Sequence, residues 1–279
     1  MKKISRRSFL AAAGLSVAAL ALTACGGSSA STASSVASSA ASSEAASTSA
    51  AAGELTTVEA GKLTMATNAA FPPYEMTTDA GEFEGIDIET AQAIADKLGL
   101  ELQIDDMDFD AALLSVQQGK ADIVMAGVTV TDERKAVMDF SDSYATGIQS
   151  IIVPEGSDIA SPDDLADKKI GTQRGTTGYI YCSDDFGDDS VVAYDDGLTA
   201  VQALNNGQVD AVVIDNAPAQ EFIAANPGLK ILDTSYAEED YAIGMAKNSP
   251  LEDAVNSVLE ELKADGTLQA IVDKYITAE

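Results

Sequence analysis

The sequence predicts an α/β protein with two lobes joined by a two-strand hinge, and three observations support this class. From about Leu55 onward, short apolar strands alternate with amphipathic helices, as in sheets flanked by helices. The same alternation restarts after residue 153, which indicates a second unit of nearly equal size. Two extended segments, 149–154 and 241–247, can carry the chain out of the first unit and back. A cleft between two such lobes is a natural ligand site.

The first unit is expected to contain alternating strands and two helices. Its first helix shows apolar residues at helical spacing from Ile88 to Leu98, and Gly99 follows as an end signal. The expected elements are strands at 63–67, 101–105, 122–126 and 148–153 and helices at 88–98 and 110–118.

The second unit repeats this order, and a helical stretch then ends the chain. The expected elements are strands at 169–173, 191–194 and 211–215 and helices at 177–182, 198–205 and 217–225. The stretch 251–276, broken around Asp265-Gly266, is expected to return to the first lobe. The predicted boundaries are therefore lobe 1 at 55–150, lobe 2 at 151–243 and the return to lobe 1 at 244–279.

The first 24 residues have the pattern of an export signal. Four basic residues precede the apolar run from Phe9 to Leu22, which is too short to span a bilayer as a stable helix. The run ends in Leu22-Thr23-Ala24-Cys25, which resembles a bacterial lipobox. A lipoprotein signal peptide at 1–24 and lipidation of Cys25 are therefore predicted, with an ordinary cleavage site as the alternative. Ser5-Arg6-Arg7 also fits twin-arginine export, so that route and the Sec route both stay open.

Residues 25–54 are predicted to form a flexible tether. From Gly26 to Gly53 the chain is almost entirely Ser, Ala, Thr and Gly, and Glu44 is the only charge. Such a segment has too little apolar bulk to offset its chain entropy, and its reach is roughly 30 Å. With lipid on Cys25, the protein would be held on the outer face of the cell membrane without spanning it.

The charge and residue inventory excludes several kinds of function. Sixteen basic and 45 acidic residues give a net charge of −29, which becomes −33 once residues 1–24 are removed. This field repels nucleic acid, so no nucleic-acid partner is expected. The chain has no histidine, the usual general base and metal ligand, and no cofactor or metal site is predicted. The acidic stretch 184–189 could bind calcium, but solvated loops are the simpler interpretation. Without Cys25, only Cys182 remains, so no internal disulfide forms.

Four stretches together resemble a known family. They are Thr67–Glu75, Gly85–Glu89, Asp122–Ser141 and Gly171–Thr177. In their order and spacing, the chain from about 60 to 276 resembles the family 3 bacterial extracellular solute-binding proteins of amino-acid ABC transporters. The resemblance implies the type II periplasmic-binding-protein-like fold, a free L-amino acid as ligand, a membrane permease of an ABC importer as partner, and a monomer. It implies a binding protein and not an enzyme.

The stretch from Gly127 to Lys135 joins a glycine, a hydroxyl and an arginine. The planar, permanently charged guanidinium suits a carboxylate taken out of water. Thr131 reads as the cap of a short helix. The resemblance implies that Gly127, Thr129 and Arg134 hold the α-amino and α-carboxylate groups of the ligand. The alternative for Arg134 is a surface position paired with acidic neighbours.

Two residues of the second unit complete these expected contacts. Thr177 follows a strand and opens a helix, where N–H groups point into a cleft. The resemblance makes Thr177 a carboxylate contact, and capping by Thr176 is the alternative. Asp215 ends a strand at the carboxyl edge of the sheet, where α/β proteins bind ligands. The resemblance pairs Asp215 with the ligand ammonium. The alternative is that Asp215 caps the next helix, and both roles are possible at once.

The ligand side chain is expected to meet two rings and an amide. Phe71 and Phe109 match family positions whose rings enclose that side chain, although either ring could be ordinary core. Asn68 stands where several relatives place Asp, and a neutral amide does not demand a cationic partner. Arg174 is the only other basic residue near these motifs and could face solvent. A polar or cationic amino acid is therefore expected over an acidic one.

Two other classes of function are possible on this fold. Relatives include cyclohexadienyl dehydratases, in which a cleft carboxylate could act as general acid, but no activated nucleophile or metal set favours an enzyme here. A ligand sensor or adhesin is the third class, and a sensor would need a fused signalling domain. No G-x-x-x-x-G-K-[ST] stretch is present, so ATP binding is not expected.

Overall fold

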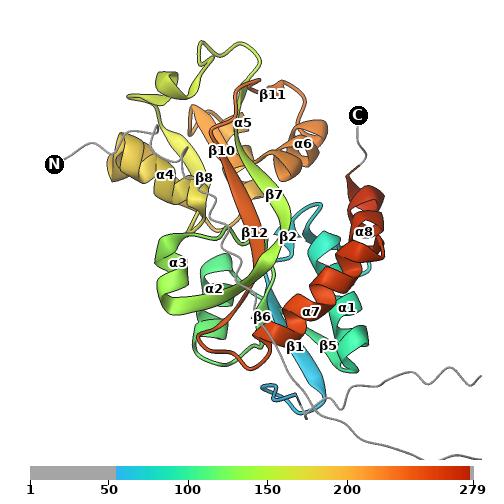
Figure 1. The fold of residues 1–279 in the computed structure, drawn as a ribbon. Helices are drawn as coiled ribbons and strands as arrows, with labels where there is room; N and C mark the ends of the chain where they lie inside the picture. The colour runs from blue at the N-terminus through green and yellow to red at the C-terminus, as the bar shows by residue number, and fades with distance from the viewer. Residues whose placement is uncertain (1–54, 277–279) are drawn as a thin grey trace, which may run out of the picture. The chain divides into compact units, whose positions relative to one another are not determined.

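The structure is a computed structural model that describes residues 55–276 (Figure 1). The predicted signal peptide at 1–24, the predicted lipidation site Cys25 and the predicted tether at 25–54 lie outside the described residues. The strands are β1 (Lys62–Thr67), β2 (Ala70–Phe71), β3 (Glu75–Thr77), β4 (Phe83–Glu84), β5 (Glu101–Asp106), β6 (Ile123–Val124), β7 (Met138–Pro154), β8 (Ile170–Gln173), β9 (Val191–Tyr194), β10 (Ala211–Asp215), β11 (Leu229–Ile231) and β12 (Ala237–Ala246). The α-helices are α1 (Ile86–Leu98), α2 (Phe109–Gln117), α3 (Asp132–Val137), α4 (Thr177–Phe186), α5 (Gly197–Asn205), α6 (Asn216–Ala225), α7 (Glu252–Ala264) and α8 (Thr267–Tyr275).

A mixed sheet organises the described residues, and its strand order is β5-β1-β6-β12-β7-β10-β8-β9, with β11 paired to β7. At one end β1 runs parallel to β5 and β6, and at the other end β8 runs parallel to β9 and β10. Between these parallel sets, β7 and β12 pair antiparallel and lie side by side in Figure 1. The α/β class and the two-strand hinge expected from the sequence are confirmed.

Separate hydrophobic clusters cover the two ends of the sheet. One cluster joins β1 and the middle of β12 to α1, α7 and α8, so the C-terminal helices pack beside α1 (Figure 1). Another joins β10 and part of β7 to α5 and α6. This packing agrees with a C-terminal return to the first lobe. The boundaries at 55–150, 151–243 and 244–279 remain a prediction.

Most of the expected elements are present, with four differences. The hinge strand β7 begins at Met138 and not near residue 148, and β12 begins at Ala237 and not at Tyr241. Register shifts around Ala242 disturb the alternation of buried and exposed residues that would have revealed these strands. The strand expected at 122–126 keeps only two residues. The short strands β2, β3, β4 and β11 were not predicted.

The aspartates of the acidic stretch 184–189 are exposed to solvent as expected, but the stretch is not a loop. Its first part belongs to α4, and its last two residues open a 3-10 turn at Asp188–Ser190. Among residues 55–276, no helix combines the length and the apolar character that crossing a bilayer requires.

A close contact fixes the pairing of the two hinge strands. Gly147 on β7 stands opposite Glu239 on β12, and the ring of Tyr241 lies diagonally over it. A Cβ on Gly147 would come within 2.4 Å of Cζ of Tyr241, whose side chain is 1% exposed. The missing side chain at 147 therefore provides the space in which the buried ring lies.

We expect Gly147→Ala to lower the free energy of unfolding by about 1–3 kcal/mol, because the methyl group overpacks a buried ring. The matched control is Gly156→Ala, since a Cβ there meets nothing within 4 Å and neither glycine needs a positive φ. That control should stay within about 1 kcal/mol of the wild type. Urea unfolding of both variants measures the difference, and equal stabilities would contradict the packing argument.

Candidate functional site

A cavity lies beside the hinge strands, between the two parallel sets of strands. Its empty space is about 410 Å³ when the open solvent at its mouth is included, and only about 30 Å³ is accessible to the centre of a water-sized sphere. All eight residues predicted as ligand contacts line it. Six of them come from segments that precede β7 in the chain: Asn68, Phe71, Phe109, Gly127, Thr129 and Arg134. Thr177 and Asp215 come from segments that follow β7.

Arg134 is buried in the cavity wall, so the alternative of a surface residue is wrong. Arg134 lies in the first turn of α3. The N-cap of this helix, Thr131, accepts a hydrogen bond through Oγ1 from the Arg134 N–H at 3.2 Å. Its guanidinium donates from Nη1 to Thr129 O at 2.8 Å and from Nη2 to Gly175 O at 3.1 Å. It forms no ion pair with a carboxylate of the described residues. The cavity thus contains a buried cation whose hydrogen bonds go to neutral carbonyls.

Burial lowers the pKa of the Arg134 guanidinium, and the charge of Glu239 opposes this shift. An arginine stays protonated in proteins, so burial mainly makes the charge demand a partner. The ring of Phe109 supplies a weak one, with its centroid 5.3 Å from Cζ of Arg134. An anion entering the cavity could therefore pair with this cation.

Asp215 both caps a helix and lines the cavity. Its Oδ1 accepts from the Ala217 N–H at 2.9 Å as the N-cap of α6, and its Oδ2 accepts from the Ile148 N–H at 2.7 Å. Burial raises the pKa of the Asp215 carboxyl to about 6, against the opposing effect of these hydrogen bonds. The two roles considered for Asp215 are therefore compatible.

Thr129 and Thr177 meet at a carboxylate that the sequence analysis missed. Oε2 of Glu239 on β12 accepts from Thr129 Oγ1, from Thr177 Oγ1 and from Gln149 Nε2, each at 3.0 Å. Thr129 precedes α3 and Thr177 opens α4, so these donors come from opposite ends of the sheet. Thr176 is the helix cap, accepting from the Tyr179 N–H at 3.4 Å, which leaves Thr177 to the cavity.

Asn68 is held by protein groups on both sides of the cavity. Its Nδ2 donates to Met107 O at 2.9 Å, and its Oδ1 accepts from Gln173 Nε2 at 2.8 Å. Gln173 is the last residue of β8, so this bond joins the two ends of the sheet directly. Gln173 was also missed, although its place at the carboxyl end of a parallel strand is a recognisable signal.

The two predicted rings serve the core as well as the cavity. Phe71 stacks on Tyr74 with centroids 5.8 Å apart, and Tyr74 meets Tyr241 edge to face at 5.4 Å. Phe109 opens α2 and packs in a hydrophobic cluster with β6 and Met138. Each ring therefore packs in the core and also lines the cavity.

Gly127 has a backbone that other residues rarely adopt, with φ of 54°. A Cβ there would lie 2.9 Å from Cε1 of Phe71, and the Gly127 N–H donates to Asp87 Oδ2 at 3.0 Å. Gly127 therefore allows the backbone to reach the cavity while Asp87 holds it in place.

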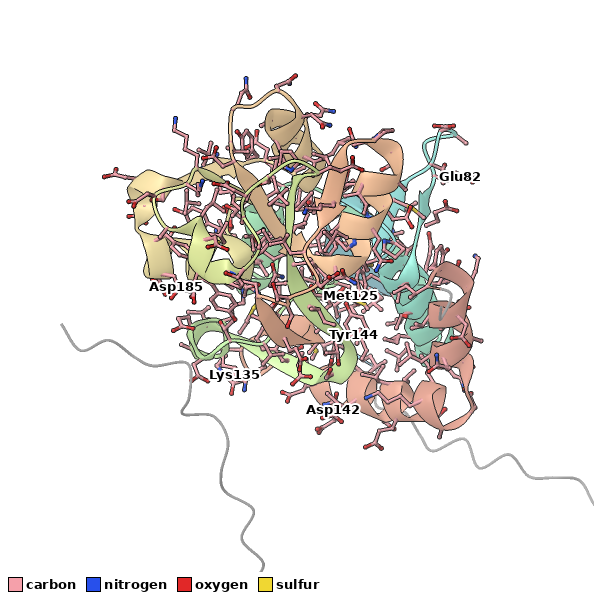
Figure 2. The ribbon with its side chains drawn as sticks, turned by 90° about the horizontal axis from the view of Figure 1, so that it is seen from above. Glu82, Met125, Lys135, Asp142, Tyr144 and Asp185 are labelled. Carbon is pink, nitrogen blue, oxygen red and sulfur yellow. The ribbon has the colours of Figure 1, made fainter. Side chains whose placement is uncertain are left out.

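A pair of buried carboxyls supports this wall. Glu75 lines the cavity, and Asp87 lies behind it, where both side chains are fully buried. Burial raises the pKa of Asp87 to about 6, and burial and the neighbouring Asp87 raise the pKa of Glu75 well above its ordinary value. Tyr144, labelled near the centre of Figure 2, adjoins Asp87. Neither carboxyl was predicted, because their proximity arises only in the fold.

Arg174 lies outside the cavity. Its side chain is 56% exposed and pairs with Asp195 at 3.5 Å. It lines a separate hollow together with Asp108 and Asp110. The possibility that Arg174 faces solvent is thus the one that the structure supports.

The fold matches that of the periplasmic amino-acid-binding proteins. The sequence profile of the bacterial extracellular solute-binding proteins, family 3, matches residues 63–278. The chain belongs to this family, which places it among extracellular solute-binding proteins.

Similar proteins of known name share most of the described chain. The L-cystine-binding protein TcyJ of Escherichia coli (strain K12) is 32% identical over 226 residues, covering 79% of this chain and 85% of TcyJ. The arginine-, lysine-, histidine-binding protein ArtJ of Geobacillus stearothermophilus is 33% identical with a TM-score of 0.75, covering 78% of this chain and 96% of ArtJ. An ancestral arginine-binding protein bound to glutamine is 41% identical with a TM-score of 0.74, covering 78% of this chain and 99% of that protein. These relatives are binding proteins by name and not enzymes.

The buried carboxyls predict how stability depends on pH. The pKa of Asp87 is about 6 in the fold against an ordinary 3.8, so the folded state holds its proton more tightly than the unfolded state. Stability from this group is therefore greatest below pH 3.8 and falls as pH rises through about 6. We expect the protein to be more stable at pH 5 than at pH 7.5, with a contribution from Asp87 on the order of 1 kcal/mol.

Asp87→Asn should reduce this difference by that amount, because the amide can still accept from Gly127 and does not titrate. Glu84→Gln removes one charge from an exposed strand residue and should leave the difference nearly intact. Urea unfolding at both pH values measures it, and an unchanged pH dependence in Asp87→Asn would refute the role assigned to the pair.

Proposed function

We propose that the protein captures a free L-amino acid in this cavity and delivers it to an ABC importer. One observation carries the proposal: a buried guanidinium without an ion-pair partner in the described residues and a buried aspartate line the same cavity. A ligand with one carboxylate and one ammonium, close together, complements both groups. Such a ligand is a zwitterionic amino acid.

The roles follow from the chemistry of each group. Arg134 would bind the carboxylate, with help from the N–H groups in the first turn of α4, which have no acceptor within the helix. Asp215 would bind the ammonium, and Gly127 and Thr129 would contact these α-groups. Phe71 and Phe109 would enclose the side chain of the ligand beside Asn68.

The polar groups that line the cavity favour a polar or cationic ligand over an acidic one. Glu75 and Asp215 line the cavity, and Arg134 is its only basic lining residue. Once the α-groups are bound, Glu75 and the amides of Asn68 and Gln173 would remain for the ligand side chain. The names of the relatives agree, since they mention cystine, arginine, lysine, histidine and glutamine.

Binding would favour the closed form because contacts come from both ends of the sheet. A ligand shifts such an equilibrium only through its differential affinity for the two states. A ligand held by Arg134 on one side and by Asp215 and Thr177 on the other provides that difference. The closed monomer would then dock on a membrane permease of the importer.

A thermal-shift screen of the twenty L-amino acids tests this function. We expect at least one polar or cationic amino acid to raise the midpoint of unfolding in the wild type and to leave it unchanged in Arg134→Ala. Removing one partner of a buried charge pair costs about 2–5 kcal/mol, which is an affinity loss of at least about thirtyfold. Arg174→Ala is the matched control, because this arginine lies outside the cavity, and it should bind as the wild type does. No response to any amino acid, or equal responses in both variants, would count against the proposal.

The proposed lipid anchor on Cys25 has its own test. In a bacterial host, the wild type should fractionate with membranes and incorporate labelled palmitate, while Cys25→Ser should be exported without lipid and remain soluble. Cys182→Ser is the control, because this buried thiol is not part of the proposed lipobox. Palmitate labelling that survives Cys25→Ser would refute the anchor.

A further inference from the structure

Glu239 is the middle residue of the acidic run Glu238-Glu239-Asp240, a pattern typical of a solvent-exposed segment. In β12, however, Glu238 and Asp240 are exposed, while Glu239 is only 6% exposed. Alternate residues of a strand point to opposite faces, so Glu239 and Tyr241 share the inner face of β12. A carboxylate of the hinge therefore lies directly behind the wall of the cavity, where it contacts residues that line it.

Three donors converge on one oxygen of this carboxylate. They are the hydroxyls of Thr129 and Thr177 and the amide of Gln149, each 3.0 Å from Oε2 of Glu239. The two hydroxyl oxygens are 3.4 Å from each other. A buried carboxylate is costly unless hydrogen bonds satisfy it, and charged hydrogen bonds of this kind are the stronger class. This arrangement therefore holds both threonine side chains in defined orientations.

The number of hydroxyl hydrogens then determines what each threonine can offer to a ligand. A hydroxyl has a single hydrogen and two lone pairs, and an ionised carboxylate can only accept. When Thr129 and Thr177 donate to Glu239, their hydrogens are used, and only lone pairs remain for the cavity. Both side chains then act toward a ligand as acceptors and not as donors.

The charge of Glu239 also acts on Arg134. Among the charges that favour the protonated form of Arg134, Glu239 has the largest effect. Glu239 is thus the main counter-charge of the guanidinium, but it is not in direct ion-pair contact, so the guanidinium can still take a carboxylate. The hydroxyl of Tyr181 also faces this carboxylate, and burial and then Glu239 raise the pKa of Tyr181.

We propose that Glu239 is a positioning residue of the amino-acid site, an inference that rests on the function proposed above. By taking the hydrogens of Thr129 and Thr177, it turns both hydroxyl oxygens into acceptors for the ligand ammonium. The ligand carboxylate is left to Arg134 and to the N–H groups that open α4. The same oxygen joins Thr129 at one end of the sheet to Thr177 at the other end and so stabilises the closed cavity.

Isothermal titration calorimetry with L-arginine and L-glutamine tests this assignment. Glu239→Gln keeps the shape of the side chain, but its amide can donate to the hydroxyls, which then no longer present lone pairs alone to the ligand. We expect the affinity of the better probe to fall about tenfold or more, as for loss of a hydrogen bond to a charged group. Glu238→Gln is the matched control, because it removes the same charge from the exposed face of the same strand, and it should stay within about twofold of the wild type.

A second pair of variants separates positioning from a general structural effect. In a Thr177→Val background, Glu239→Gln should cost much less than in the wild type, because one of the oriented hydroxyls is gone. In a Thr177→Ser background, which keeps the hydroxyl, the full loss should return. Glu239→Asp keeps the charge, but its shorter side chain moves the carboxylate oxygen away from the two threonine hydroxyls, so it should also weaken binding. It serves as a second variant if Glu239→Gln folds poorly.

The outcomes distinguish this proposal from the one on which it rests. Wild-type protein that binds neither probe would overturn the assignment of amino-acid binding with these ligands and with it the role of Glu239. Wild-type protein that binds normally while Glu239→Gln stays within twofold of it would overturn the role of Glu239 alone. An equal loss in the Thr177→Val and Thr177→Ser backgrounds would likewise show that Glu239 does not act through the hydroxyl.

Discussion

The antiparallel pairing of β7 and β12 is the constraint on which the rest of the structure depends. These two strands pass between the parallel sets at either end of the sheet, and every group of the cavity is positioned relative to them. Gln149, Tyr241 and Glu239 belong to the pair itself. Gly147 lets the two strands approach around the buried Tyr241 ring. The hinge is therefore part of the binding wall as well as the connection between its halves.

Buried charge is distributed unevenly around this wall. One guanidinium, at Arg134, lies in the same region as the carboxyls of Asp215, Glu75 and Glu239. Both oxygens of Asp215 and Oε2 of Glu239 accept hydrogen bonds, whereas Glu75 and Oε1 of Glu239 accept none from the described residues. The fold bears the cost of desolvating these groups in advance. Under the proposed function, a zwitterion that entered would find oriented partners, and little reorganisation would be required at the moment of binding.

Local signals predicted much of the fold, and the family resemblance supplied the eight predicted site residues, all of which line the cavity. Helical spacing with Gly99 gave α1, and the Thr131 cap placed Arg134 at the start of α3. The first ten residues of β7 were missed because bulged pairing breaks the period of two. Glu239 was hidden among acidic neighbours, and Glu75 and Asp87 come together only through tertiary packing. Single residues with family counterparts were thus predictable, whereas networks that depend on several distant segments were not.

The hydrogen bond between Asn68 and Gln173 couples two properties that are usually discussed separately. Under the proposed function, Asn68 would lie beside the ligand side chain, and its oxygen also accepts the hydrogen bond from Gln173 that joins the two sides of the cavity. An evolutionary replacement at this position would alter selectivity and the ease of closure in a single step. A change of ligand preference through position 68 would then require a compensating change at Gln173 on the opposite side of the cavity. Substitutions at these two positions should therefore occur together.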